Sequence, residues 1–508
     1  MSKKINNIVI IGGGAAGWLT AGLLAKEHPD KSIILIESAD IGISGVGEGT
    51  WPSMRNTLQR IGVKESDFLQ QCDASFKQGS KFINWRGKEQ ADNYYHPFMI
   101  PEGYYKYDVH TAWQQLFPEQ KYADAMNMQS FICQAALAPK QLNTPEYAGV
   151  TNYGYHLDAH KFAQFLARHC VNTLNVKHIT DNVLHANNNA QGYIESVTTQ
   201  NNGEIYGDLF IDCSGSQGLL IAKHYRIPFL DQSHILFNNT AVAAQLPYES
   251  PSQNIASATL STAQSAGWIW DIGLPTRRGI GYTFSDKYCD VTTAIETLKS
   301  YAAQSVGIQQ ASKIETRTLR FTPGYREVFW HKNCVAIGMS QGFIEPLEAS
   351  ALAMVELSIS MLSEQMPVNQ VHMQLLSDRF NKRFRYRWEQ VINFLKLHYV
   401  LSSRDDNSYW CDNHHPKSIP IELQNLLTLW QYQAPSRFDF IENEEIFSSP
   451  SYQYVLYGMG FKTKQTTKLD NHTYQMAQQL YQLNRKKIAQ YLQKLPTNRL
   501  LLKQLQKE

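Results

Sequence analysis

Residues 8–37 read IVIIGGGAAGWLTAGLLAKEHPDKSIILIE, and the order of residue types in this stretch decides the fold. Ile8–Ile11 is a short apolar strand that runs into consecutive glycines, and the residues from Ala15 onward have helical spacing. A second apolar strand, Ile33–Ile36, ends on the acidic residue Glu37. Strand, glycine turn, helix, strand and acid in this order predict a dinucleotide-binding βαβ unit.

Each glycine of the turn has its own steric reason. Gly12 permits the tight turn, Gly14 lets the backbone approach a pyrophosphate, and Gly17 lets helix and strand pack closely. The helix N-terminus directs free N–H groups and the positive end of its dipole toward the phosphates, and Glu37 can accept hydrogen bonds from an adenosine ribose. The alternative is a structural βαβ unit without a ligand. The cofactor-binding residues predicted here are Gly12, Gly14, Ala15, Ala16, Gly17 and Glu37.

Bulk composition excludes several classes of protein. The chain has 508 residues, enough for two or three domains, and its formal net charge of +2 creates no strong field for nucleic acid or membrane. No signal peptide and no apolar run of about 20 residues is evident. The seven cysteines contain no CxxC pair, which is typical of free thiols in a reducing cytoplasm. We therefore expect a cytoplasmic protein that binds neither nucleic acid nor membrane.

A glycine-rich segment, SADIGISGVGEGTWPSM, follows at 38–54. It is either an irregular surface loop or a strap that lies flat against a cofactor, where side chains would obstruct contact. Its glycines are Gly42, Gly45, Gly47 and Gly49. The aromatic content of 12% can line a flat pocket as well as a core.

Two motifs are ambiguous when only their spacing is considered. In the strand-like segment FKQGSKFINW, Lys77 and Lys81 fall on the same side, so alternation predicts that both face water; a chemical role for Lys77 is the alternative. In YHLDAH, His156, Asp158 and His160 are spaced like metal ligands. No further ligand cluster accompanies them and Asp158 suits a helix N-cap, so we predict no metal.

The remaining chain alternates strand and helix patterns. Period-two alternation from Val176 predicts a β-meander that ends at a second glycine turn containing Gly215, and more strands are expected through 235–246 and 279–285. Around Gly338 a strand, a turn and a helix starting near Leu347 form an anion site at the helix N-terminus, where Glu348 is otherwise an ordinary first-turn acid. The residues beyond are helical.

Several segments together resemble the flavin-dependent halogenases of the tryptophan-halogenase superfamily, over nearly the full length. GGGAAGW at 12–18 is similar to the FAD signature, and GVGEGT at 45–50 to the strap. FKQGSKFINW at 76–85 resembles the segment of the catalytic lysine. GWIWDI at 267–272 resembles a two-tryptophan motif, and FIEPLEAS at 343–350 resembles the EPLES segment. YHLDAH and DCSG are similar too. Several motifs in the right order are more specific than any single one.

The resemblance implies an α/β (α+β) fold with a Rossmann-like FAD-binding domain of the flavin hydroxylase type, covered by a helical substrate-capping module. The implied domains are 1–365, with an aromatic insertion near 92–150, and 366–508. A separate flavin reductase is implied to deliver FADH2, which with O2 and chloride or bromide gives hypohalous acid. That acid passes through an internal tunnel to a lysine, which presents the halogen to a small, electron-rich aromatic substrate. A homodimer is an open alternative to a monomer.

The resemblance also implies residue roles. Lys77 and Glu348 correspond to the catalytic pair, while Trp268 and Trp270 correspond to residues that keep substrate away from the flavin. The segment whose N–H groups hold the halide falls on Ser350 and Ala351. Further cofactor contacts fall on Gly47, Gly215 and Gly338. The substrate pocket falls on His96, Phe98, His398 and Phe447.

The sequence departs from the tryptophan-specific members at Pro275, which is displaced, and at Ala351, which follows EPLEAS. Indole, a larger indole-bearing molecule or another electron-rich aromatic is therefore as consistent with the sequence as free tryptophan. Two other functions are open: an FAD-dependent aromatic hydroxylase, which leaves Lys77 and Trp268 without a role, and a non-catalytic flavoprotein.

Overall fold

The computed structural model describes residues 4–42, 47–87, 92–442, 444–464 and 468–505. The chain packs as two compact units that alternate along the sequence. The first comprises Met1–Ala74, Leu157–Ser233 and Phe321–Trp388; the second comprises Ser75–His156, His234–Arg320 and Glu389–Glu508. The functional domains expected at 1–365 and 366–508 are a different division and remain a prediction.

A mainly parallel sheet forms the centre of the first unit, and its described strands follow the order β20-β21-β12-β1-β2-β8. Its parallel strands are β1 (Asn7–Ile11), β2 (Ser32–Glu37), β8 (Lys177–Thr180), β12 (Leu209–Asp212) and β21 (Cys334–Ala336); β20 (Trp330–His331) pairs antiparallel at the edge. Ile8, Val9 and Ile10 are fully buried, as expected for a strand covered on both faces. The predicted βαβ unit is confirmed.

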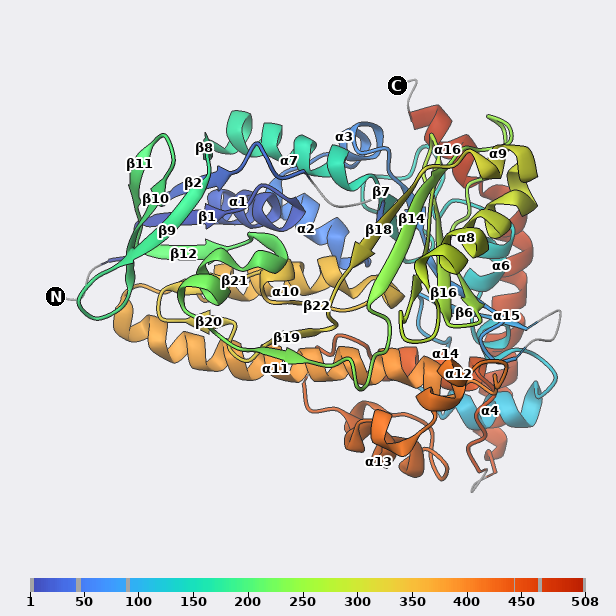
Figure 1. Ribbon diagram of the computed structural model, residues 1–508. Helices are drawn as coiled ribbons and strands as arrows, with labels where there is room; N and C mark the ends of the chain where they lie inside the picture. The colour runs from blue at the N-terminus through green and yellow to red at the C-terminus, as the bar shows by residue number, and fades with distance from the viewer. Residues whose placement is uncertain (1–3, 43–46, 88–91, 443, 465–467, 506–508) are drawn as a thin grey trace. The chain divides into compact units, whose positions relative to one another are not determined.

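Helices pack on this sheet and on one another. Helix α1 (Ala15–Glu27) contacts β2, α2 (Ser53–Ile61), α7 (Ala159–Leu174) and α10 (Ser350–Glu364), as Figure 1 shows. Residues 53–71 form two helices, because Gly62 ends α2 with a left-handed φ of 85° before α3 (Glu65–Gln71) begins. Short 3₁₀-helices are η1 (Gly215–Gln217), η3 (Gly338–Ser340) and η4 (Leu347–Ala349), and η2 (Leu219–His224) is a short π-helix.

The predicted meander from Val176 is only partly antiparallel. Strands β9 (Val183–Asn188), β10 (Ile194–Thr199) and β11 (Gly203–Tyr206) form it, whereas the flanking strands β8 and β12 join the parallel sheet. The reason for β12 is burial, since all of its residues are buried and it pairs with β1. A small sheet combines β13 (Phe229–Asp231), β19 (Gly324–Arg326) and β22 (Gly342–Phe343).

A mixed sheet organises the second unit, with its described strands in the order β18-β14-β17-β16-β15-β5-β6. These are β5 (Gly79–Ile83), β6 (Asn93–Pro97), β14 (Thr240–Leu246), β15 (Thr259–Gln264), β16 (Gly267–Gly273), β17 (Arg278–Phe284) and β18 (Thr316–Arg320). The strands expected in 235–246 and 279–285 are thus present. Helix α8 (Val291–Val306) packs on β14 and β17 (Figure 1), followed by α9 (Ile308–Ser312).

The aromatic insertion near 92–150 contributes β6 and three short helices to the second unit. These are α4 (Val109–Leu116), α5 (Tyr122–Met126) and α6 (Gln129–Gln134), and all three contact the long helix α15 (Asn471–Lys494). Ile132 and Ile488 belong to one buried cluster that joins α6 to α15. The remaining helices are α12 (Ser408–Asn413), α13 (Ile421–Leu429), α14 (Ser449–Gly458) and α16 (Asn498–Leu505).

Helix α11 (Gln370–Val400) runs from the segment of the first unit into that of the second. Its apolar stripe belongs to the core, because Phe380, Phe384, Val391 and Leu395 are fully buried. Within the described part of the chain, no helix combines the length and apolar character needed to cross a bilayer.

Candidate active site

The glycine turn of the first unit is built as the sequence predicts. At Gly12 φ is 116°, and a Cβ there would overlap the carbonyl oxygen of Cys213; a Cβ at Gly17 would overlap the carbonyl oxygen of Gly12. Gly14 is different, because its φ of −77° suits any residue and no heavy atom of the described residues lies within 4 Å of an added Cβ. The turn therefore needs Gly12 and Gly17 for itself, whereas Gly14 borders open space where a pyrophosphate fits.

Glu37, the acidic residue predicted to bind the adenosine ribose, lies over this turn. Glu37 Oε1 lies 2.7 Å from His178 Nε2, and the Glu37 carboxylate occupies the position that a Cβ on Gly13 would take. The His178 ring stands edge-on to Trp18, with ring centroids 5.1 Å apart. His178 was not singled out by sequence reasoning, because only strand pairing between β2 and β8 brings it beside Glu37.

A second glycine turn follows β12. Asp212 accepts hydrogen bonds from the backbone N–H groups of Ser214, Leu220 and Ile221 at 2.8–3.1 Å, which holds the loop after the strand. Gly215 has φ 71° with open space at its Cβ position. At Gly338, φ is 76°, and an added Cβ would lie 2.8 Å from the Cβ of Ala16.

The predicted glycines thus gather at the carboxyl ends of β1, β12 and β21, where open parallel sheets bind their ligands. The open positions at Gly14 and Gly215 fit an extended dinucleotide such as FAD. In the strap, Gly47 has φ 143°, a conformation that favours glycine, while Gly45 lies outside the described residues.

The acidic segment before α10 has an unusual backbone. Glu348 and Ala349 both adopt left-handed conformations, with φ of 62° and 56°, and the α-helix proper begins only at Ser350. Glu348 is 7% exposed, and Trp51 Nε1 donates a 2.7 Å hydrogen bond to its carbonyl oxygen. Non-glycine residues held in this region cost roughly 1–3 kcal/mol each and cluster at functional sites. Glu348 is therefore a turn residue and not a first-turn helix acid.

The first N–H groups of α10 belong to Ser350 and Ala351. Such groups have no acceptor within the helix and carry its positive dipole end. No side chain caps this end of α10, since Ala349 is the N-cap residue. The geometry suits a small anion, as the sequence predicts.

A second buried acid stands two turns further along α10. Thr57 Oγ1 and Ser53 Oγ donate hydrogen bonds to the two oxygens of the Glu356 carboxyl group at 2.5 and 3.0 Å, which ties α10 to α2. Burial raises the pKa of Glu356 to about 8, against the two hydrogen bonds, which lower it. An acid in the middle of the apolar run LAMVELSISML was the available signal, and sequence reasoning missed it.

Because of this pKa, the effect of Glu356→Gln on stability should depend on pH. The unfolded carboxyl ionises near pH ~4.3, so between about pH 4.3 and pH 8 the folded state keeps a proton that the unfolded state has lost. Stability from this group therefore falls as the pH rises, and the neutral glutamine escapes that loss. The thermal midpoint of the variant relative to wild type should increase from about pH 5 to about pH 8. A difference that stays constant with pH would contradict the assignment.

Lys77 lies in the second unit and is buried, not water-facing. The segment expected to be one strand is broken at Gln78 into β4 (Ser75–Lys77) and β5, because Gly79 has φ 147° and its Cβ position is filled by His96 backbone. Strand β4 pairs with β7 (Gly154–Leu157), whereas β5 pairs with β6 and β15. Lys77 is 1% exposed, with Nζ 5.4 Å from the Phe98 ring centroid, so the alternation-based expectation for Lys77 was wrong.

Aromatic rings gather in the same unit around Phe394 of α11. Phe447 stacks on Phe394 with ring centroids 3.8 Å apart, and His398 and His96 lie at 5.3 and 5.7 Å from it. Three of the predicted pocket residues thus surround one ring that sequence reasoning missed. The fourth, Phe98, is the neighbour of Lys77.

The two tryptophans of β16 are buried in sheet packing. Trp268 lies 6.2 Å from the Trp85 ring, and the Trp270 ring covers Gly281, whose Cβ position it fills. Trp268 and Trp270 are 1% and 9% exposed. Their predicted role between flavin and substrate remains a prediction.

The residues of the YHLDAH motif lie in different environments. Asp158 is confirmed as the N-cap of α7, since its carboxylate accepts from the N–H groups of His160 and Lys161 at 3.1 and 3.0 Å. His156 is buried on β7, whereas His160 is exposed on α7. Among the described residues, no three His, Cys, Asp or Glu side chains are grouped to hold a metal ion.

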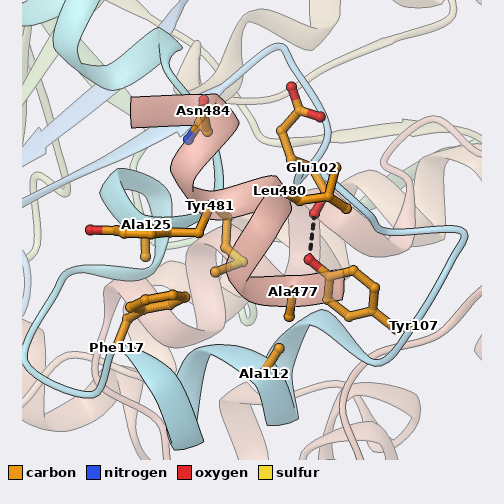
Figure 2. Close-up of a pocket in the computed structure, with 10 residues that line it drawn as sticks. Glu102, Tyr107, Ala112, Phe117, Ala125, Ala477, Leu480, Tyr481 and Asn484 are labelled. Atoms are coloured by element: carbon orange, nitrogen blue, oxygen red, sulfur yellow. Dashed lines mark hydrogen bonds between the residues drawn. The ribbon is translucent and has the colours of Figure 1, made fainter. Parts of the chain in front are cut away.

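A small cavity in the second unit is unrelated to the predicted residues. Figure 2 shows it between α4, α5 and α15, where the Tyr107 hydroxyl donates to the Glu102 carbonyl at 3.3 Å. Its volume is ≈ 10 Å³, about the space of one water molecule. None of the predicted site residues lines it.

The chain is similar to several known proteins over most of its length. Residues 7–475 match the family model described as tryptophan halogenase. The crystal structure of a tryptophan halogenase from Shewanella frigidimarina is 48% identical and has a TM-score of 0.97, covering 99% of this chain and 98% of that chain. Tryptophan 7-halogenase RebH of Lentzea aerocolonigenes is 34% identical over 433 residues, 81% of this chain and 79% of its own length. A flavin-dependent halogenase from Xanthomonas campestris has a TM-score of 0.88 at 27% identity, over 99% of both chains.

Proposed function

This chain belongs to the tryptophan halogenase family of flavin-dependent enzymes, and on that premise we propose that it halogenates an electron-rich aromatic ring by way of Lys77. The observation that carries the proposal is the burial of Lys77 beside Phe98, in the same unit as the predicted pocket aromatics. Hypohalous acid is an indiscriminate oxidant, so a fixed donor is needed to aim it at one carbon of the substrate. A buried amine among aromatic rings supplies that donor.

Lys77 acts on hypohalous acid in one of two ways. Its ammonium donates a hydrogen bond to the oxygen of the acid, or the neutral amine takes the halogen as a haloamine and releases water. In both cases the net reaction is HOX + ArH → ArX + H2O, in which the aromatic carbon gains the halogen and loses a proton. The low local dielectric strengthens the polarising effect of the ammonium.

The first unit supplies the oxidant. Gly14, Gly215 and the N-terminus of α1 would hold the FAD phosphates, and Glu37 would hold the adenosine ribose. When bound as FADH2 from a separate flavin reductase, the cofactor would supply the electrons with which O2 and halide give hypohalous acid. The N–H groups of Ser350 and Ala351 would bind chloride or bromide.

Glu348 assists the reaction by accepting the ring proton or by polarising the oxidant. Glu348→Gln removes the charge, keeps the shape and should lower turnover by roughly 10²–10⁴-fold. The flavin affinity of the variant should match wild type, since no predicted contact to the dinucleotide is changed. Steady-state rates with saturating halide test this, and an unchanged rate would leave Glu348 with only its backbone role in the turn.

An indole-type ring is the substrate class that we propose. Phe394 and Phe447 offer flat apolar surfaces, while His96 and His398 add polar edges, which together suit a bicyclic aromatic with one N–H. Two of the relatives named above, from Lentzea aerocolonigenes and Shewanella frigidimarina, are tryptophan halogenases by name. Free tryptophan, indole and larger indole-bearing molecules share the ring that these side chains would contact.

The test is mass spectrometry of an aromatic panel incubated with the enzyme, FAD, a flavin reductase, O2 and either bromide or chloride. The expected product carries the bromine or chlorine isotope pattern and forms only when halide is present. Oxygen insertion without halide would overturn the proposal in favour of a hydroxylase. Flavin binding without any product across the panel would favour a non-catalytic flavoprotein.

A further inference from the structure

His156 of the YHLDAH motif lies on β7, the strand that pairs with the strand of Lys77. In the antiparallel pair of β4 and β7, Lys77 is opposite Gly154, and Ser75 is opposite His156. Strand alternation places these positions on one face. Gly154 has no side chain to occupy the space across from Lys77, and His156 stands on the diagonal, roughly 7–8 Å away between Cα atoms, where long side chains still meet.

The imidazole of His156 is held at one nitrogen only. Nε2 lies 2.8 Å from Thr259 Oγ1, whereas Nδ1 is buried and has no hydrogen-bond partner among the described residues. Burial, and then the positive charge of Lys77, hold the pKa of His156 well below its usual range, so the ring is neutral. One nitrogen therefore carries a proton and the other a lone pair.

The charge of Lys77 selects the tautomer. A proton on Nδ1 would be repelled by the ammonium and would also be a buried donor without an acceptor. With the proton on Nε2, that nitrogen donates to the Thr259 hydroxyl and Nδ1 keeps its lone pair. The site thus contains a buried neutral acceptor, His156 Nδ1, which experiences the positive charge of the buried Lys77 ammonium.

We propose that His156 is a positioning residue for Lys77: Nδ1, which has no partner among the described residues in this structure, accepts one N–H of the ammonium when the flexible Lys77 side chain turns toward it, and the other N–H groups serve the hypohalous acid. The proposal rests on the proposed role of Lys77 as the halogen donor. A lysine ammonium has three donors on a flexible four-carbon stem, so an acceptor that holds one donor restricts the direction of the other two. A neutral acceptor holds the ammonium without forming an ion pair. A carboxylate would form one and would compete with the hypohalous acid for the N–H groups.

Substitutions at His156 separate the two ring nitrogens. Asparagine places an amide oxygen where Nδ1 stands, whereas glutamine places its amide where Nε2 stands and keeps only the partner of Thr259. His156→Asn should keep kcat within about threefold of wild type, and His156→Gln and His156→Leu should lose roughly 10- to 100-fold, as for a hydrogen bond to a charged group. The KM for the aromatic substrate should change little. His160→Leu, at the exposed histidine of the same motif, is the matched control and should leave kcat unchanged.

A second measurement reports on Lys77 without turnover. In protein labelled with ¹³C-lysine, the Cε resonance that disappears in Lys77→Arg is followed against pH. Its titration midpoint should fall in His156→Leu and His156→Gln and stay near wild type in His156→Asn. An active His156→Gln with an impaired His156→Asn, or an unshifted midpoint in His156→Leu, would overturn the proposal. If Lys77→Ala still halogenates, the proposed function fails, and the midpoints still decide whether His156 holds the amine.

Discussion

Lys77→Ala abolishes halogenation and leaves the fold and the flavin affinity unchanged: this is the expected result with the largest effect. The amine is the only group of Lys77 that can bind or carry an electrophilic halogen, so its loss removes an interaction made with the reacting atoms themselves. We expect turnover to fall by roughly 10³-fold or more. The product assay by mass spectrometry measures this, and flavin fluorescence titration measures FAD binding in the same preparation.

Two further variants make the Lys77 experiment decisive. Lys77→Met keeps most of the buried volume, so that loss of activity in both variants is not a packing effect. Lys81→Ala is the matched lysine control, because Lys81 belongs to β5 and to a different ladder, with its Nζ 5.4 Å from the ring of Tyr95 on β6. It should retain activity. Retained turnover in Lys77→Ala would remove this lysine from the chemistry.

Gly14→Val should prevent FAD binding without unfolding the protein. The backbone at Gly14 has an ordinary φ of −77°, and its Cβ position has no heavy atom within 4 Å, so the chain itself tolerates a side chain. The branched side chain would instead occupy the space needed by the pyrophosphate at the N-terminus of α1. We expect flavin affinity to fall by at least roughly 10²-fold, with halogenation lost in parallel.

The neighbouring glycines provide the contrast for this experiment. Gly12→Ala and Gly17→Ala would place a Cβ on the backbone carbonyl oxygens of Cys213 and Gly12, so these variants should lower the thermal midpoint as well as flavin affinity. Gly14→Val should keep the circular dichroism spectrum and midpoint of wild type. Undiminished flavin affinity in Gly14→Val would mean that the phosphates bind elsewhere.

Local signals in the sequence identified the features whose cause is local. In the turn 12–17, Gly12 has a φ of 116° and Gly17 lies against the carbonyl oxygen of Gly12, which are both local reasons for glycine, and Asp158 caps the helix that follows it directly. The motif order 12–18, 76–85 and 343–350 was enough to place the chain in its family. The apolar residues at helical spacing on α11 form a buried stripe, which is again a pattern local in the sequence.

The exposure of Lys77 could not be read from alternation. Period two assumes one continuous strand, but the chain turns at Gln78 and Gly79, so Lys77 and Lys81 enter different ladders. The strand that pairs with β4, which carries Lys77, is β7, and it begins at Gly154, far away in the sequence. Likewise, Glu348 is a left-handed turn residue because the packing around it, including the hydrogen bond from Trp51, holds a backbone that its own sequence does not favour.

The amino-acid sequence by itself determined the nucleotide-binding turn, the helical and strand segments and the family, because these depend on residues close together in the chain. Only the tertiary structure decided which polar groups are buried and what they meet: His178 beside Glu37, Thr57 on Glu356, and His156 on the ladder of Lys77. Burial and electrostatic coupling arise from pairing between distant segments, and no local pattern encodes the distance between two side chains that strand pairing alone brings together.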